Sequence, residues 1–256
     1  MAETSIEWTA TQAPDGTMLP GYTMNFWIGC TKVSPACDHC YAERYGNRFG
    51  VQWGNHPRRR TSEANWRKPL AWNARAKKLG VRLKVFTNSL ADFFDNQIDS
   101  QWRYDAWGII WQCENLDWLI LTKRPQNIAN MMPRYGGRWP WSNVWLGTTV
   151  ENQEEMAKRR RHLLYVPAAV HFLSCEPLLG RVWLPSPDTY SNSISWVICG
   201  GESGPGKRPM DLAWARALRD ECAELSIPFF MKQVDKVQPV PDDLMIRQMP
   251  VVEART

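Results

Sequence analysis

The chain has 256 residues, of which 44% are hydrophobic and 22% charged, with a formal net charge of +5. This is the balance of an ordinary globular protein that can bury a substantial core. A membrane span needs an apolar run of about 18 residues or more, which the sequence lacks, and its start shows no basic region followed by an apolar stretch, so we expect neither insertion into a membrane nor secretion.

Seven short apolar runs, bounded by polar or glycine residues, predict strands that are buried on both faces of a sheet. They span residues 25–29, 83–89, 117–124, 143–149, 170–176, 195–203 and 228–233. Most steps from one run to the next take about 25–35 residues, the length of a strand–helix unit, although the first step is longer. The rhythm indicates parallel strands joined by helices.

Helical signals are legible between these runs. Residues 69–79 predict a helix that Gly80 stops, and residues 100–114 predict another with one apolar stripe. Pro125 suits the first turn of a third helix, and Asp211 suits the N-cap of the last one. Together the elements favour an α/β fold of about six to seven parallel strands. Both an incomplete (β/α) barrel and an open, doubly wound sheet fit this pattern.

Two basic runs have different interpretations. In the run at 158–162, glutamates at positions 154 and 155 precede basic residues by four positions, which predicts a solvated helix face with ion pairs. The run at 56–60 lies between two tryptophans in a loop-like stretch, where arginines among aromatic rings can meet phosphates or bases. No repeat or linker divides the chain. We expect an N-terminal extension at 1–25, a partial barrel at 26–235 and a C-terminal tail at 236–256.

Polar side chains follow the predicted strands, at the point where each strand ends. In parallel α/β folds the carboxyl ends of the strands gather at one edge, where active sites lie. We therefore expect a site rim that contains Cys30, Asn88, Ser89, Lys123, Arg124, Thr148, Thr149, Glu176, Glu202, Lys232 and Gln233. The basic pair at 123 and 124 can grip an anionic substrate, and Glu176 is expected to face the site.

The segment "WIGCTKVSPACDHCYAERYG" (27–46) places Cys30, Cys37 and Cys40 in the pattern Cys-x6-Cys-x2-Cys. A disulfide would leave one thiol over, and the odd total of seven cysteines, four of them inside apparent core elements, indicates a reducing cytoplasm. Structural zinc normally takes four closed ligands, and His39, His56 or a distant cysteine would have to supply the fourth. Three thiolates without a fourth suit a [4Fe–4S] cluster that leaves one iron open to a small molecule.

Cluster and zinc lead to different functions. The cluster predicts an enzyme, whereas zinc predicts a non-catalytic module that binds nucleic acid or a protein partner.

"CDHCYAER" after the first strand resembles the cluster loop of the radical S-adenosylmethionine (SAM) superfamily. The chain also resembles a phage and prophage family described as radical-SAM-like with a three-cysteine motif. The matching segments are "SIEWT", "GCTKVSPACDHCYAER", "LTKRP", "GTTVEN", "SCEPLLG", "VICGGESG" and "MKQ". They run from residue 5 to about residue 233 and so cover nearly all of the chain. Two features depart from the superfamily pattern: the first two cysteines lie further apart, and the Gly-Gly-Glu motif follows the sixth predicted strand instead of the second.

The resemblance implies an incomplete barrel of the radical SAM type, with a [4Fe–4S] cluster and SAM as cofactors and a 5′-deoxyadenosyl radical as the reactive species. It implies that the three cysteines are the cluster ligands. The residues expected at the cofactor are His39, Tyr41, Asn88, Ser89, Asp92, Thr149, Gly200, Gly201 and Glu202. Within this set, the amino group of SAM would be met either by Asn88, Ser89 and Asp92 or else by Glu202. The two glycines would let the backbone approach the cofactor closely.

The same reasoning extends to substrate and partners. The residues expected at the substrate are Lys123, Arg124, Glu176 and Lys232, and the phage relatives and positive charge favour a nucleotide or a nucleic-acid base as the substrate. Radical SAM chemistry needs an electron donor, so a reductase such as flavodoxin or ferredoxin is an expected partner, together with a partner protein encoded nearby. The expected location is the cytoplasm, that of the host if the protein is phage-encoded.

Overall fold

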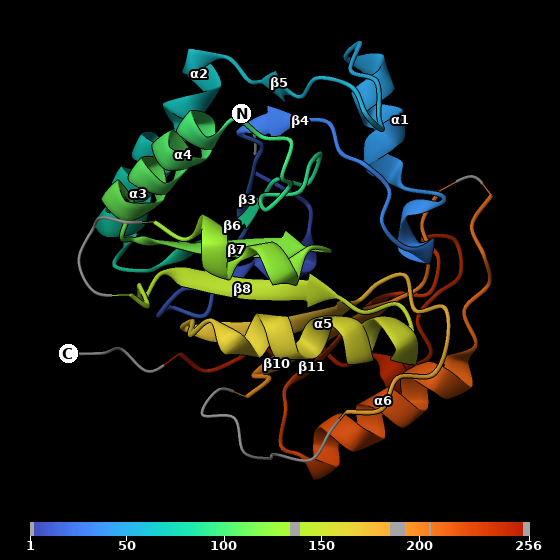
Figure 1. Ribbon diagram of the computed structural model, residues 1–256. Helices are drawn as coiled ribbons and strands as arrows, with labels where there is room; N and C mark the ends of the chain where they lie inside the picture. The colour runs from blue at the N-terminus through green and yellow to red at the C-terminus, as the bar shows by residue number, and fades with distance from the viewer. Residues whose placement is uncertain (1–2, 134–138, 185–192, 205, 253–256) are drawn as a thin grey trace.

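A computed structural model of the protein describes residues 3–133, 139–184, 193–204 and 206–252. Its centre is a seven-stranded sheet with the order β11-β10-β9-β8-β7-β6-β3, in which all neighbours pair in parallel. The strands are β3 (Tyr22–Met24), β6 (Leu83–Thr87), β7 (Leu116–Thr122), β8 (Val144–Thr149), β9 (Val170–Cys175), β10 (Trp196–Gly200) and β11 (Phe229–Gln233). Because strands that follow one another in the chain are neighbours, the sheet is a curled half-barrel and not a doubly wound sheet (Figure 1).

Four long helices cover one face of this sheet. They are α3 (Lys68–Leu79), α4 (Ser100–Gln112), α5 (Gln153–Tyr165) and α6 (Leu212–Glu224). Helix α3 packs on β6, β7 and α4, α5 packs on β8, and α6 packs on β10 and β11 (Figure 1). None of the helices in the described ranges is long and apolar enough to cross a membrane. Two short helices, α1 (Tyr41–Arg48) and α2 (Glu63–Trp66), follow the cysteine segment.

The predicted helix signals are confirmed in three cases. Gly80 ends α3 with a φ of 65°, and the Asp211 side chain caps α6 by accepting a hydrogen bond from the Ala213 amide. Residues 100–112 form α4 as expected. Pro125 was expected to begin a helix, but it begins only two short 3₁₀ turns, η3 (Pro125–Asn127) and η4 (Ala129–Met131). The following residue, Met132, is extended, as residues before a proline usually are.

Six of the seven predicted strands are confirmed, and the first is displaced. The strand expected at 25–29 is replaced in the main sheet by β3, which lies within the segment expected to be an N-terminal extension. The chain leaves the sheet at Asn25, because the side chains of Thr61 and Asn65 bind its carbonyl oxygen. Beyond it, β4 (Trp27–Ile28) pairs with β5 (Arg59–Arg60) in an antiparallel ribbon. A second ribbon joins β1 (Thr11–Gln12) to β2 (Met18–Leu19).

Both faces of the sheet are packed. On the face away from the long helices, the buried aromatic residues are Phe86, Trp145, Phe172, Trp196 and Phe230. Trp8 from η1 (Glu7–Thr9) closes this cluster, with its ring centroid 4.8 Å from that of Phe86. At the other end of the chain, residues 246–248 bond to β11 through backbone contacts at Met231 and Phe229, after the short turn η5 (Asp242–Leu244). Of the tail expected at 236–256, residues 246–248 therefore lie along the edge strand of the sheet.

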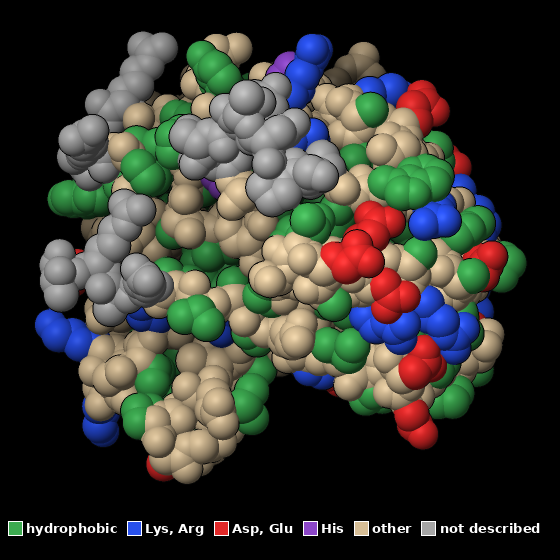
Figure 2. All heavy atoms as spheres, turned by 90° about the horizontal axis from the view of Figure 1, so that it is seen from below, with side chains coloured by type: hydrophobic (Ala, Val, Ile, Leu, Met, Phe, Trp, Pro, Cys, Tyr) green, Lys and Arg blue, Asp and Glu red, His purple; other side chains and the backbone are tan. Residues whose placement is uncertain are grey.

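The basic run on α5 forms the predicted ion pairs. Lys158 binds Glu154 and Glu155, and Arg159 binds Glu155 and Glu151. Arg159 is only 4% exposed, so this part of the run is buried instead of solvated. The face of the molecule seen in Figure 2 carries basic and acidic side chains next to each other and no broad patch of one sign.

Candidate functional site at the carboxyl ends of the strands

A cavity of about 450 Å³ lies at the carboxyl ends of the strands. Every residue predicted for the site lines it except Thr148 and Gly200, which lie in β8 and β10. The lining residues of that set are Cys30, Cys37, His39, Cys40, Tyr41, Asn88, Ser89, Asp92, Lys123, Arg124, Thr149, Glu176, Gly201, Glu202, Lys232 and Gln233. Its remaining wall includes Trp8, Phe86 and Leu121. The predicted rim is thus brought together in space.

The cysteine loop, defined here as residues 30–40, forms one side of this cavity. Cys30 follows β4, Cys37 ends the turn η2 (Pro35–Cys37), and Cys40 directly precedes α1. All seven cysteines of the chain are free. Among the residues that the structure describes, no group of three or more His, Cys, Asp or Glu side chains is arranged to hold a metal ion. The three thiols therefore share a cavity without forming a closed ligand set.

Arg124 fastens the first end of the cysteine loop. It is 5% exposed, and its Nη1 lies 3.4 Å from the Cys30 sulfur while its Nη2 donates to the Thr31 carbonyl at 2.8 Å. Burial raises the pKa of Cys30 to about 11, and Asp92 adds to this shift while Arg124 opposes it. The Cys30 thiol is thus protonated at neutral pH, and binding a metal there must release that proton.

Asp92 holds Arg124 in this position. Its carboxylate accepts hydrogen bonds from Arg124 Nη1 at 3.1 Å, from Thr122 Oγ1 at 2.6 Å, and from the Lys123 and Phe94 amides at 2.9 Å each. Asp92 was predicted to meet the cofactor and Arg124 to meet the substrate. In this structure they bind each other and support the cysteine loop, and both line the cavity.

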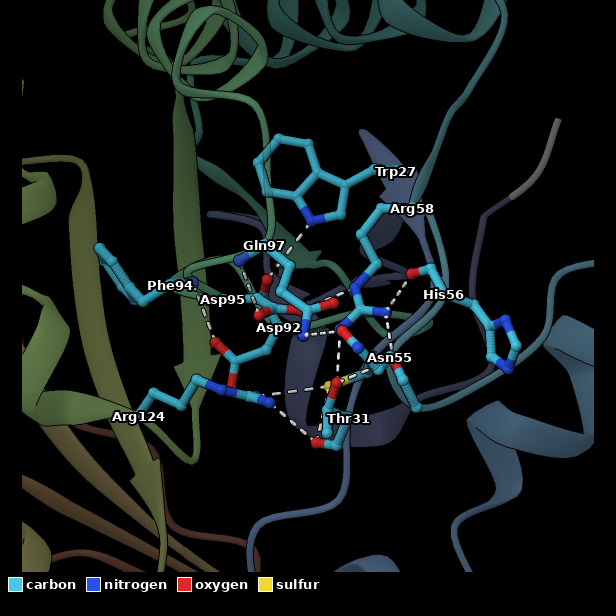
Figure 3. A network of polar contacts seen from close by, with 12 residues as sticks. Trp27, Thr31, Asn55, His56, Arg58, Asp92, Phe94, Asp95, Gln97 and Arg124 are labelled. Atoms are coloured by element: carbon cyan, nitrogen blue, oxygen red, sulfur yellow. Dashed lines mark hydrogen bonds and ion pairs between the residues drawn. The ribbon is translucent and has the colours of Figure 1, made fainter.

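A second buried arginine, Arg58, also binds the cysteine loop at Thr31. Arg58 donates from Nε to Asp95 at 2.8 Å and from Nη2 to the Thr31 hydroxyl at 2.6 Å. Figure 3 shows both guanidinium groups, those of Arg58 and Arg124, converging on Thr31. Arg58 is only 7% exposed. The expectation that the basic run at 56–60 meets phosphates is therefore wrong for this member, because burial and the ion pair with Asp95 occupy it.

Glu151 fastens the middle of the loop. It is fully buried just beyond β8, accepts from the Ala36 amide at 3.2 Å and binds Arg159 Nη1 at 2.8 Å. Burial raises the pKa of this carboxyl, but Arg159 and the hydrogen bonds outweigh burial, so the pKa lies below its ordinary value. Sequence reasoning missed Glu151, although its place two residues after a predicted strand could have drawn attention to it.

Glu202 fastens the far end of the loop. It accepts from Arg208 Nη2 at 2.7 Å and lies 3.0 Å from His39 Nδ1. Arg208 also donates to the Pro35 carbonyl at 2.8 Å and pairs with Asp38 at 3.2 Å. Burial raises the pKa of Glu202, but the hydrogen bonds from Arg208 and His39 outweigh it, and the pKa is lowered. Glu202 and His39 were both expected to contact a cofactor, and in this structure they contact each other.

Of the two adjacent glycines, Gly201 has a structural explanation. A Cβ on Gly201 would lie 1.9 Å from the Val234 carbonyl oxygen, whereas a Cβ on Gly200 would come no closer than 3.3 Å to the Gln233 carbonyl. The backbone that approaches Gly201 is therefore the chain just after β11. The predicted close approach of a cofactor is not needed to explain Gly201.

The remaining predicted residues have mixed surroundings. Lys232 forms an ion pair with Glu176 at the cavity wall. Asn88, at a φ of 59°, accepts from the Phe26 amide, and Ser89 bonds to Asn25. Within the described ranges, the Lys123 ammonium has no hydrogen-bond or ion-pair partner, so it is a cation at the cavity that remains available to an anionic ligand.

Comparison with known proteins gives a family but no activity. No curated protein and no solved structure matches the chain. A family model described as a protein of unknown function (DUF5131) matches residues 3–249. That match covers nearly the whole chain, including the sheet, the cysteine loop and the cavity. The chain therefore belongs to the DUF5131 family.

Proposed function

We propose that this protein is a radical SAM-type enzyme that binds a [4Fe–4S] cluster and SAM at the cavity and modifies a nucleotide or a nucleic-acid base in the cytoplasm. The observation that carries the proposal is that three free thiols from one short loop line the same cavity as the polar ends of the parallel strands. Soft thiolates favour iron–sulfur clusters, and the carboxyl edge of a parallel sheet is where cofactors bind.

The donor set fits a cluster better than it fits zinc. A structural zinc ion normally takes four closed ligands, and the thiols that line the cavity are the three of the cysteine loop. Each thiolate of a cluster bonds to a different iron, so its cysteines surround a larger object. Three thiols on one side of a cavity, with their loop bound to the sheet, suit a cluster that leaves one iron open to a small molecule.

The residues of this chain would serve the cofactor mainly by positioning. When bound, the cluster and SAM supply a 5′-deoxyadenosyl radical. Arg124, Glu151 and Glu202 hold the loop that carries the thiols. Trp8 and Phe86 form an apolar wall that limits access of water. Lys123 offers a cation to an anionic group of the cofactor or substrate.

The experiment is anaerobic reconstitution of the full chain with iron and sulfide. We expect about four irons and four sulfides per chain, as for a [4Fe–4S] cluster. After reduction, by dithionite or by a flavodoxin with its reductase, the protein should cleave SAM and release 5′-deoxyadenosine. Iron content and product release are measured separately, so loss of one can be told from loss of the other.

Single variants supply the control. Cys30→Ala, Cys37→Ala and Cys40→Ala should each lower the iron content and abolish 5′-deoxyadenosine release. Cys113→Ala, at a fully buried thiol outside the cavity, should retain both properties. The proposal is wrong if the three loop variants bind iron as the wild type does, or if zinc at one ion per chain is the only metal retained.

A further inference from the structure

We propose that the exposed face of α1 binds single-stranded nucleic acid and leads it to the cavity. This surface, called the α1 face below, consists of Tyr41, Arg44, Tyr45, Arg48 and Phe49, together with the neighbouring Arg59. The inference deepens the proposed function by naming the substrate class, and it rests on that function only for what happens to the strand inside the cavity.

Three aromatic rings lie exposed along one side of α1. Tyr41, Tyr45 and Phe49 are 41%, 48% and 50% exposed and recur every four residues, which places them on one helix face. Successive rings are therefore about 6 Å apart along the helix axis. Rings exposed in such a row are suited to stack unpaired bases. Tyr41 and Tyr45 also line the cavity, so the row leads from the surface into the site.

Three arginines on or next to α1 have no acidic partner in the described ranges. Arg48 lies over the Tyr45 ring at 5.3 Å, and Arg59 donates to the Phe49 carbonyl at 2.6 Å. Arg44 is exposed one helical turn before Arg48. These cations are suited to phosphate groups, because no ion pair neutralises them.

The nearby carboxylates do not offset this charge. Glu43 on α1 pairs with Lys32 at 3.1 Å, and Asp38 pairs with Arg208 at 3.2 Å. The α1 face therefore keeps a net positive charge next to exposed aromatic rings. By contrast, on α5, the helix that carries the longest basic run, Lys158 and Arg159 are paired with glutamates.

A single strand fits these features better than a duplex or an acidic protein. The bases of a duplex are hidden inside its stack, so exposed rings gain nothing from it, whereas an unpaired strand presents both phosphates and bases.

Of the three arginines in the basic run at 56–60, only Arg59 is available to a ligand. Arg58 pairs with Asp95, and Arg60 pairs with Glu63 and lies over Trp66. Arginines next to exposed aromatic rings, which were predicted at 56–60, are therefore found mainly on the α1 face.

The test is fluorescence anisotropy of the full-length protein with a short labelled oligonucleotide, prepared as single-stranded DNA, single-stranded RNA and duplex DNA. We expect affinity for at least one single strand to exceed that for the duplex. It should fall with salt, and Arg44→Gln, Arg48→Gln and Arg59→Gln should each reduce the salt slope by about 0.7. Tyr45→Ala should weaken binding about tenfold through lost stacking.

Arg161→Gln is the matched control, because it removes one exposed guanidinium from α5 and should leave binding unchanged. Circular dichroism checks that each variant is folded. The inference is overturned if neither single strand binds, if the duplex binds equally well, if Arg48→Gln and Arg161→Gln behave alike, or if poly-glutamate displaces the oligonucleotide at equal charge concentration. Because binding is measured without SAM or reductant, oligonucleotide binding can succeed while cluster loading fails, or the reverse.

Discussion

Arg124 joins the first cysteine of the loop to a buried carboxylate: its Nη1 lies 3.4 Å from Cys30 Sγ and 3.1 Å from Asp92 Oδ2. The same guanidinium binds the Thr31 carbonyl. One side chain from the end of β7 therefore fixes both the sulfur and the backbone of the loop. Charged hydrogen bonds of this kind are stronger than neutral ones and restrict geometry as well.

Replacing this arginine should weaken both the fold and the site. Arg124→Gln leaves Asp92 buried without its cation, and removing one partner of a buried pair costs about 3 kcal/mol or more in unfolding free energy. Urea denaturation of the metal-free protein measures this loss. In a cluster-loaded protein, loss of a hydrogen bond to sulfur should also lower the reduction potential. Arg124→Lys keeps the charge, so its urea midpoint should lie between those of the wild type and Arg124→Gln. A wild-type midpoint for Arg124→Gln would contradict this role of the arginine.

Glu202 should contribute stability that depends on pH. Its folded pKa lies below the ordinary 4.5, so its contribution is fully present above about pH 4.5 and is lost as pH falls through the folded pKa. Glu202→Gln should therefore cost about 2 kcal/mol at pH 7, the scale of hydrogen bonds to charged groups, and less below pH 4.5. Urea unfolding at several pH values tests this. Glu224→Gln, at an exposed position on α6, serves as the control; a Glu202→Gln penalty that stayed constant down to pH 3 would refute the linkage.

The two glycines after β10 should differ in their tolerance of a methyl group. Gly201→Ala would place a Cβ 1.9 Å from backbone oxygen, which cannot move without displacing the chain after β11. We expect a loss of about 3 kcal/mol, at the upper end for overpacking, or failure to fold. Gly200→Ala meets nothing closer than 3.3 Å and should cost about 1 kcal/mol or less. Melting temperatures by circular dichroism compare the two; equal values would mean that the strand contact is not the constraint.

The cysteines should fall into two classes of reactivity. Cys113, Cys175, Cys199 and Cys222 are fully buried, and burial raises the pKa of Cys113 and of Cys222 to about 12. Few of these thiols are ionised at pH 8, so iodoacetamide should leave them unmodified in the native protein. The half-buried Cys40 should react, and urea should expose all seven. Peptide mass spectrometry identifies the labelled sites; native labelling of Cys113 as fast as Cys40 would contradict the packing.

Much of the sheet could be predicted from the sequence because its strands are buried on both faces and are therefore continuous apolar runs. The gathering of the rim residues also followed from the sequence, since parallel strands bring their carboxyl ends together. The first strand was misplaced by a few residues, because its end is set by Thr61 and Asn65, which lie far along the chain from Asn25.

The contacts within the site could not be predicted in the same way. Strand ends identify which residues meet, but not which of them bind each other. His39 and Glu202 are 163 residues apart in the chain and touch in the folded protein. Cys30 and Arg124 are 94 residues apart. A sequence shows which charged residues lie at the rim, whereas the pairing of those charges depends on side-chain packing and burial.

The cysteine loop is synthesised before the residues that anchor it. Its fastening residues Arg124, Glu151 and Glu202 all follow it in the chain. Residues 30–40 therefore leave the ribosome long before the groups that hold them exist, and domains generally fold as units. We expect the nascent loop to remain unanchored until most of the polypeptide has emerged. The proposed cluster would therefore be loaded into the completed protein, and a chain truncated before β10 would not retain it.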